Sequence, residues 1–129
     1  MEYRFDAAAR YSRTHEWVRV EGAEAVIGVS DYAQHSLSDV VFVEVPGPGG
    51  ALTREKPFTV IESVKAAEDV IAPVTGTVTA KNGRLEKEPE LVNKDPFGEG
   101  WLVRVKLSDA KELDALMDEA AYRKFVASL

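Results

Sequence analysis

Apolar and polar positions alternate along most of the chain, which predicts a protein built mainly from short β-strands. Successive side chains of a strand point to opposite faces of a sheet, so alternation is typical of a strand with one buried face. Glycine, proline and asparagine lie between the alternating segments, as they do at turns. The expected strands lie at residues 16–20, 25–29, 40–45, 77–80 and 101–107, with two more forming a hairpin within residues 58–73.

Helical spacing replaces alternation in two parts of the chain. Ser30 and Asp31 can cap a short helix that extends to about Leu37. Within residues 108–127, apolar residues recur at intervals of three and four, which predicts two C-terminal helices. Residues 85–100 show no sustained period, so we expect a loop there with a single helical turn.

The two C-terminal helices have distinct signals. Asp109 and Glu112 have the spacing of a capping box, in which each side chain bonds to the backbone of the other residue. The second helix would place Tyr122, Phe125 and Val126 on one apolar face. Both helices are therefore expected to cover the sheet.

This order of elements favours a mainly β fold. Many short strands followed by terminal helices predict a sandwich or flattened barrel of antiparallel strands, with a short internal helix and C-terminal helices. No internal repeat or linker divides the 129 residues. We therefore expect one domain over residues 1–129, long enough to bury a core without disulfides or metal.

Composition excludes several classes of function. The net charge of −6 disfavours nucleic acid as a partner, because phosphate binding needs clustered lysine and arginine. The chain has no cysteine, and His15 and His35 fall in no metal-binding pattern, so neither a metal site nor a catalytic set is expected. No apolar run is long enough for a membrane helix. The opening residues 1–6 lack the apolar core of a presequence, which favours the cytoplasm.

Lys65 is the candidate functional residue. It lies at the expected tip of the hairpin formed by residues 58–73, between Val64 and Ala66, with three carboxylates within four positions. An exposed lysine needs no functional explanation by itself. A Schiff-base lysine is usually desolvated, whereas nearby carboxylates favour the charged ammonium. Exposure on a fixed hairpin instead suits a lysine that another enzyme acylates.

These residues resemble a known family. The segments ESVKAAED (62–69) and APVTGTV (72–78) resemble the lipoyl attachment region of glycine cleavage system H proteins. The resemblance extends from about Tyr11 to Phe125. It includes HEWV (15–18), GVSDYAQ (28–34), VFVE (41–44), PELVN (89–93) and DPFGEGW (95–101).

The resemblance implies a carrier with a biotinyl/lipoyl-attachment fold, a barrel-sandwich hybrid, and no catalytic residues of its own. Lipoic acid would be joined by an amide to Lys65 as N6-lipoyllysine, loaded by a lipoate ligase or lipoyl transferase. The implied partners are glycine decarboxylase (P protein), a tetrahydrofolate-dependent aminomethyltransferase (T protein) and dihydrolipoyl dehydrogenase (L protein). The carrier would pass an aminomethyl group from the first to the second and electrons to the third. A monomer is expected.

The resemblance also implies roles for residues around Lys65. Recognition of the attachment site would involve Glu62, Val64, Ala66 and Asp69. A cleft for the aminomethyl arm would be lined by Glu16, Thr14, Val29 and Asp69. A carboxylate in such a cleft could hold a protonated amine and slow its loss to water.

Two positions depart from the family pattern. Glycine is common where Glu55 or Lys56 stands, so this turn is expected to differ or to accept a strained φ. Thr59 also occupies a position where glycine is common. The segment 46–56 is therefore the part of the fold that the sequence specifies least.

Three alternative readings of the hairpin remain open from the sequence. A biotin carrier typically sets its lysine between two methionines, and Val64 and Ala66 argue against it. A lipoyl domain of a 2-oxoacid dehydrogenase is normally joined by a flexible linker to a larger chain. A lipoate relay would instead supply lipoyl groups to other complexes.

Overall fold

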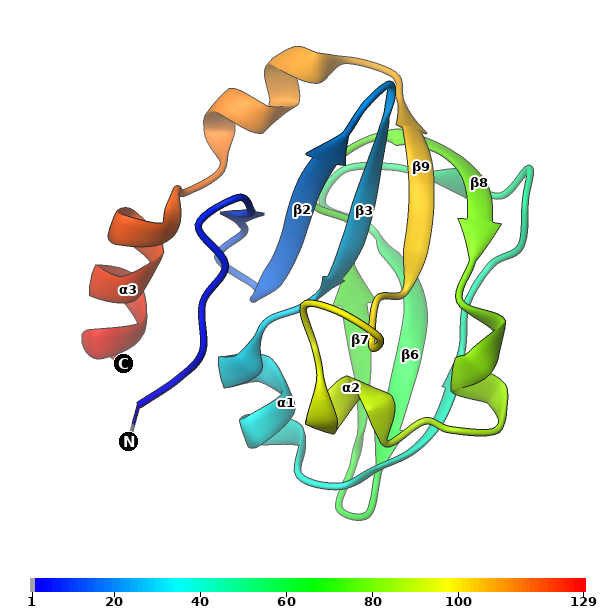
Figure 1. The fold of residues 1–129 in the computed structure, drawn as a ribbon, viewed down its shortest axis with the longest axis vertical. Coiled ribbons are helices and arrows are strands. Elements are labelled where there is room, and N and C mark those ends of the chain that lie inside the picture. The colour runs from blue at the N-terminus through cyan, green and yellow to red at the C-terminus, as the bar shows by residue number, and fades with distance from the viewer. Residues whose placement is uncertain (1) are drawn as a thin grey trace.

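The computed structural model describes residues 2–129, and Met1, which opens the N-terminal stretch considered above, lies outside the described residues. Two antiparallel sheets form its framework (Figure 1). Their strands are β1 (Arg10–Tyr11), β2 (Glu16–Glu21), β3 (Glu24–Val29), β4 (Val40–Glu44), β5 (Ala51–Leu52), β6 (Pro57–Ser63), β7 (Ala67–Ile71), β8 (Gly76–Lys81) and β9 (Val103–Leu107). The helices are α1 (Asp31–Leu37), α2 (Leu91–Lys94) and α3 (Glu119–Ala127), with 3-10 helices η1 (Gly83–Glu86) and η2 (Ala110–Ala115).

Within the described part of the chain, one sheet has the strand order β1-β2-β3-β9-β8-β5 and the other β4-β6-β7. Apolar residues from both sheets, such as Ile27, Val105, Ile61 and Val70, pack between them as the main core. The sandwich with helical decoration predicted from the alternating pattern is thereby confirmed. The β6–β7 hairpin extends beyond the body of the sandwich, and α1 and α2 lie beside it (Figure 1).

A second, aromatic cluster lies on the other face of the larger sheet. Trp17 and Val26 point away from the main core and pack under α3, where Tyr122 is fully buried. Tyr11 stacks on Tyr122 with a centroid distance of 4.2 Å and an interplanar angle of 1°. The apolar face predicted for the last helix is therefore confirmed, and it covers the sheet from outside.

Local signals explain most of the elements. Ser30 caps α1, because its hydroxyl accepts a hydrogen bond of 3.1 Å from the backbone N–H of Ala33, as predicted. Gly22 has a φ of 65° in the turn between β2 and β3, a conformation that glycine adopts without strain. Glu55 has a φ of 69°, so the turn expected to differ or to accept a strained φ contains a left-handed residue other than glycine.

The prediction of a capping box from Asp109 and Glu112 is correct for Asp109 and wrong for Glu112. Asp109 caps η2 by accepting a hydrogen bond of 3.0 Å from the backbone N–H of Lys111. The carboxylate of Glu112 instead accepts hydrogen bonds from the N–H of Thr75 at 2.7 Å and from its hydroxyl at 2.9 Å. A distant backbone donor competes successfully with the local one, and the segment forms a 3-10 helix. The predicted loop at 85–100 also contains more helix than expected, η1 and α2.

Gly28 packs closely against Trp17, so a substitution of Gly28 tests the packing of the sandwich. A Cβ at Gly28 would lie 2.7 Å from two carbon atoms of the indole ring, whose N–H is bonded to the carbonyls of Val29 and Pro96. Gly28→Ala is expected to lower the free energy of unfolding by about 1–3 kcal/mol, the usual cost of overpacking. Urea unfolding measures it. Gly83→Ala, where the added Cβ meets nothing within 4 Å, should change stability little. Equal stability of both variants would contradict this packing.

Candidate functional site

Lys65 lies at the exposed tip of the β6–β7 hairpin, as the sequence predicts. Ser63 closes the tip. Its backbone N–H donates to the carbonyl of Ala66 at 2.8 Å, and its hydroxyl accepts from the N–H groups of Lys65 and Ala66. The N–H of Val64 donates to the carbonyl of Asp39 at 2.9 Å and joins the tip to the body of the protein. The backbone that carries the lysine is therefore held at several points.

The side chain of Lys65 is free of charged partners among residues 2–129, where it forms no ion pair. The carboxylates of Glu62, Glu68 and Asp69 are near in sequence without pairing with it. Its ammonium is thus not engaged by a carboxylate of the described residues.

The outer face of the smaller sheet combines apolar and acidic side chains. Glu62 pairs with Phe42, and Val60 pairs with both Glu44 and Asp69, so these five residues share one face. Phe42 and Val60 are 46% and 41% exposed. Because Val64 at the tip is 64% exposed, the apolar surface continues toward the lysine.

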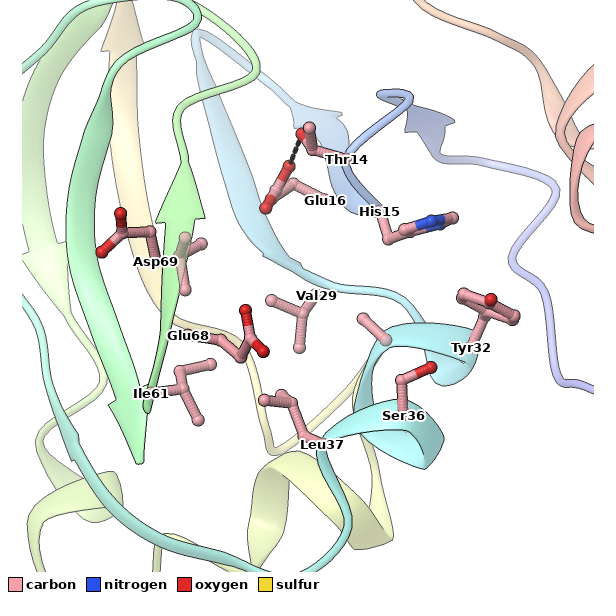
Figure 2. Close-up of a pocket in the computed structure, with 12 residues that line it drawn as sticks. Thr14, His15, Glu16, Val29, Tyr32, Ser36, Leu37, Ile61, Glu68 and Asp69 are labelled. Atoms are coloured by element: carbon pink, nitrogen blue, oxygen red, sulfur yellow. Dashed lines mark hydrogen bonds between the residues drawn. The ribbon is translucent and has the colours of Figure 1, made fainter. Parts of the chain in front are cut away.

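A cavity of about 220 Å³ lies on the inner side of the hairpin, between β7, the start of β2 and helix α1 (Figure 2). The lining residues are Thr14, His15, Glu16, Val29, Tyr32, Ala33, Ser36, Leu37, Ile61, Glu68, Asp69 and Val70. The structure thus brings together all four residues that the family resemblance places in a cleft.

Glu16 is a buried carboxylate at the end of this cavity, with only 3% of its surface exposed. Its Oε1 accepts hydrogen bonds from the hydroxyls of Ser12, at 2.9 Å, and Thr14. Its Oε2 accepts a hydrogen bond of 3.1 Å from the backbone N–H of Ile71. Burial raises the pKa of Glu16 to about 6, against the lowering effect of the hydrogen bonds from Thr14, Ile71 and Ser12.

Glu68 and Asp69 occupy opposite sides of β7. Glu68 pairs with buried Ile61, so it faces inward, and Figure 2 shows its carboxylate within the cavity. The carboxylate of Asp69 points to the other side of the strand (Figure 2), although the residue borders the cavity. Sequence reasoning did not assign Glu68 to the cleft. Strand alternation from buried Val70 was the signal that could have done so.

His15 borders the cavity but its ring turns toward α3. Its Nδ1 lies 2.7 Å from the hydroxyl of Tyr122, which lies 2.7 Å from the hydroxyl of Ser30. Burial lowers the pKa of His15, which favours the neutral imidazole. The ring also contacts Tyr32 and Phe125, with centroid distances of 4.5 and 5.8 Å. His15 therefore joins the aromatic cluster to the cavity wall.

Histidine, aspartate and glutamate within residues 2–129 form no group of three or more that could hold a metal ion. None of the helices in this part of the chain has the length and apolar character needed to cross a bilayer.

The fold and site together define a carrier of the biotinyl/lipoyl-attachment class, in which a hairpin lysine is presented by a β-sandwich. A family model described as Glycine cleavage H-protein matches residues 9–129. The chain therefore belongs to the glycine cleavage H-protein family. The function of this family is that of a lipoyl carrier in glycine cleavage, and its members are not enzymes. The biotin carrier and the dehydrogenase lipoyl domain are thus excluded.

Relatives agree with this assignment. The chain is 52% identical over 120 residues to the glycine cleavage system H protein of Beijerinckia indica, covering 93% of this chain and 97% of that one. It is 54% identical over 114 residues to a probable H protein of Haloarcula marismortui, covering 88% and 90%. A crystal structure of the H protein from Mycobacterium marinum matches with a TM-score of 0.86 and 27% identity, covering 97% and 100%.

The raised pKa of Glu16 predicts how stability depends on pH. The carboxyl has a pKa of about 6 when folded and an ordinary value of 4.5. The folded state therefore binds the proton more tightly, so its contribution is present below pH 4.5 and is lost as pH rises through 6. The loss amounts to roughly 2 kcal/mol, at about 1.4 kcal/mol per pKa unit.

Glu16→Gln removes the titrating carboxyl. Its free energy of unfolding should therefore rise relative to that of the parent by roughly 2 kcal/mol between about pH 4 and pH 8. Urea unfolding across this range measures the difference. Glu68→Gln, on an exposed residue of the same cavity, serves as the control for removing one carboxylate. Parallel curves for Glu16→Gln and the parent would show that Glu16 has an ordinary pKa.

Proposed function

We propose that Lys65 carries lipoate through an amide bond and that this chain moves one-carbon cargo and electrons between the enzymes of glycine cleavage. The observation that carries the proposal is an exposed lysine that forms no ion pair with any described residue and stands on a backbone fixed at Ser63 and Val64. Bound lipoate supplies a cyclic disulfide that takes up an aminomethyl group as it is reduced and gives up electrons when it is reoxidised. The chain supplies the attachment point, its orientation and a binding cavity.

The residues around Lys65 fit such an attachment. An enzyme that forms the amide needs an accessible amine on a backbone of fixed shape, which the Ser63 turn and the bond from Val64 to Asp39 provide. A group tethered there is present near the partner sites at about millimolar effective concentration, the range for short flexible links. The rigid hairpin limits the volume that the root of the arm explores.

The outer face of the smaller sheet supports recognition by the partners. We assign recognition of the attachment site to Glu62, Val64, Ala66 and Asp69, which are all exposed at or next to the tip. A partner with an apolar patch and a basic rim would complement the alternating valine, phenylalanine and carboxylate side chains. The partners in this proposal are glycine decarboxylase, the aminomethyltransferase, dihydrolipoyl dehydrogenase and the enzyme that attaches lipoate.

The cavity supports a second role, which is to hold the amine of the cargo. A buried carboxylate without a cationic side chain gains from the approach of a protonated amine. Ser12, Thr14 and the Ile71 N–H fix the two oxygens of Glu16, and each carboxylate oxygen can accept more than one hydrogen bond. Val29 supplies an apolar wall. Glu68 adds a second carboxylate inside, while Asp69 lies at the border.

The attachment role is tested with Lys65→Arg. The parent is expected to gain the mass of one lipoyl group after incubation with a lipoate-attaching enzyme and to support glycine-dependent aminomethyl transfer. Arginine keeps the positive charge but does not form the amide, so the variant should gain no mass and support no transfer. Lys56→Arg, at the exposed base of the hairpin, should behave as the parent. A lipoyl group on Lys65→Arg would refute the assignment, and a lipoylated parent without transfer would favour a lipoate relay.

The cavity role is tested with Glu16→Gln in the lipoylated protein. Loss of the charge should speed the release of cargo to water by about tenfold, because a charge-assisted hydrogen bond is replaced by a neutral one. Release of labelled formaldehyde from the loaded carrier measures this rate. Glu44→Gln is the comparison, since Glu44 is exposed on the outer face of the smaller sheet and does not line the cavity, so it should leave release near the parent rate. An unchanged rate in Glu16→Gln would mean that Glu16 does not hold the amine.

A further inference from the structure

The N-terminal segment lies beside α1, the helix that borders the cavity. Residues 2–8 precede the stretch that the family model matches, which begins at residue 9. In Figure 1 this segment runs between α3 and α1 before it reaches β1. Phe5 packs against Tyr122 of α3, with a centroid distance of 5.9 Å. The segment therefore belongs to the folded structure.

Arg4 anchors this segment to the start of α1 and the end of α2. Its backbone N–H donates to Oδ2 of Asp31 at 2.7 Å, and its guanidinium donates to Oδ1 at 2.9 Å. The same guanidinium donates to the carbonyls of Lys94, at 2.8 Å, and Asn93, at 3.2 Å. One side chain thus binds a carboxylate and two carbonyls at a helix end, where cations are favourable.

The charge of Asp31 is stabilised by this contact, because the side chain is only 2% exposed and has little access to water. Burial alone would raise the pKa of Asp31, but hydrogen bonds from Arg4 and Gln34 hold it below its usual value. His35 is the only other basic group in the described chain that pairs with Asp31, at 3.8 Å. A buried carboxylate that loses its main cation is strongly disfavoured.

The anchored carboxylate continues into a polar network that spans both helices. Gln34 donates to Oδ1 of Asp31 at 2.7 Å and accepts from the side-chain amide of Asn93 at 3.0 Å. Asn93 also donates to the carbonyl of Ser38 and accepts from the N–H of Val40, at 2.8 and 2.9 Å. The network therefore reaches both ends of α1 from a single arginine outside the matched region.

The position of α1 matters because this helix supplies one wall of the cavity. Its contribution consists of Tyr32, Ala33, Ser36 and Leu37. A helix of 7 residues is too short to be stable alone, so its position depends on tertiary contacts. Tyr3 adds one of these, since its ring meets the ring of Tyr32 edge-on at a centroid distance of 5.3 Å.

We propose that residues 2–8 act as a strap that holds α1 in place as a wall of the cavity, with Arg4 as the positioning residue. Arg4 contacts neither Lys65 nor the cavity, so it acts through Asp31 and α1. This inference rests on the proposed role of the cavity in holding cargo. It adds that retention of cargo is controlled by a segment that precedes residues 9–129, the region that the family model matches.

The test compares Arg4→Gln with Arg10→Gln in the full chain. Arg10 is exposed in the same part of the chain, and within residues 2–129 its side chain makes one hydrogen bond, of 3.5 Å, to the carbonyl of Leu113. Amide hydrogen exchange of Gln34 and Ser38, whose N–H groups bond within and around α1, reports on the helix before lipoylation. Arg4→Gln should speed this exchange by about tenfold, the factor expected for a lost charge-assisted interaction, with strand β6 unchanged.

The second readout is release of cargo from the loaded carrier, which a purely local structural role of Arg4 would not change. Arg4→Gln should release cargo several times faster than Arg10→Gln, while lipoylation of Lys65 proceeds at the parent rate. Arg4→Lys keeps the charge without the planar fork of donors, so it should fall between Arg4→Gln and the parent.

Unchanged exchange in α1, or release from Arg4→Gln at the control rate, would overturn the proposal. Failure of the proposed function would be seen before any Arg4 variant is made. In that case the parent would carry no lipoate on Lys65, or Glu16→Gln and the parent would release cargo at equal rates. That result would overturn the strap's role in retention as well.

Discussion

One buried carboxylate connects the two sheets beside the lysine hairpin. Glu16 begins β2 of the larger sheet, and its Oε2 accepts a hydrogen bond from the Ile71 N–H at the end of β7 in the smaller sheet. Within residues 2–129 no basic side chain pairs with it. Burying an unpaired carboxylate is unfavourable, and the raised pKa is the physical expression of that cost. This cost is consistent with the proposed role of Glu16 in binding the amine of the cargo.

The rest of the structure places the exposed Lys65 hairpin next to this buried carboxylate. Strands β6 and β7 carry Lys65 into solvent, and the bond from Val64 to Asp39 ties the hairpin tip to the segment that follows α1. Helix α1 closes the opposite wall of the cavity and is held by Arg4 through Asp31. The same small set of contacts therefore positions both Lys65, the proposed attachment point, and the wall of the cavity beside it.

Much of this arrangement could be predicted from the sequence, because the relevant signals are local. Alternation located the hairpin, and the Ser30 cap located α1. The contacts that shape the site are long-range. Glu112 follows a capping pattern yet bonds to Thr75, 37 residues away, and Ile71 lies 55 residues from Glu16. No spacing rule predicts which distant backbone donor a carboxylate will meet, so these bonds became visible only in the folded structure.

The proposed function of the cavity requires Glu16 to be a buried carboxylate that can hold a cationic amine. A carbon-13 NMR titration of the Glu16 side-chain carboxyl tests it most directly, in the unmodified protein and in the lipoylated protein loaded with cargo. We expect a midpoint near pH 6 in the unmodified protein and a lower midpoint once a protonated amine lies in the cavity. A midpoint near the ordinary value of 4.5 in the unmodified protein, or one that does not move on loading, would contradict it.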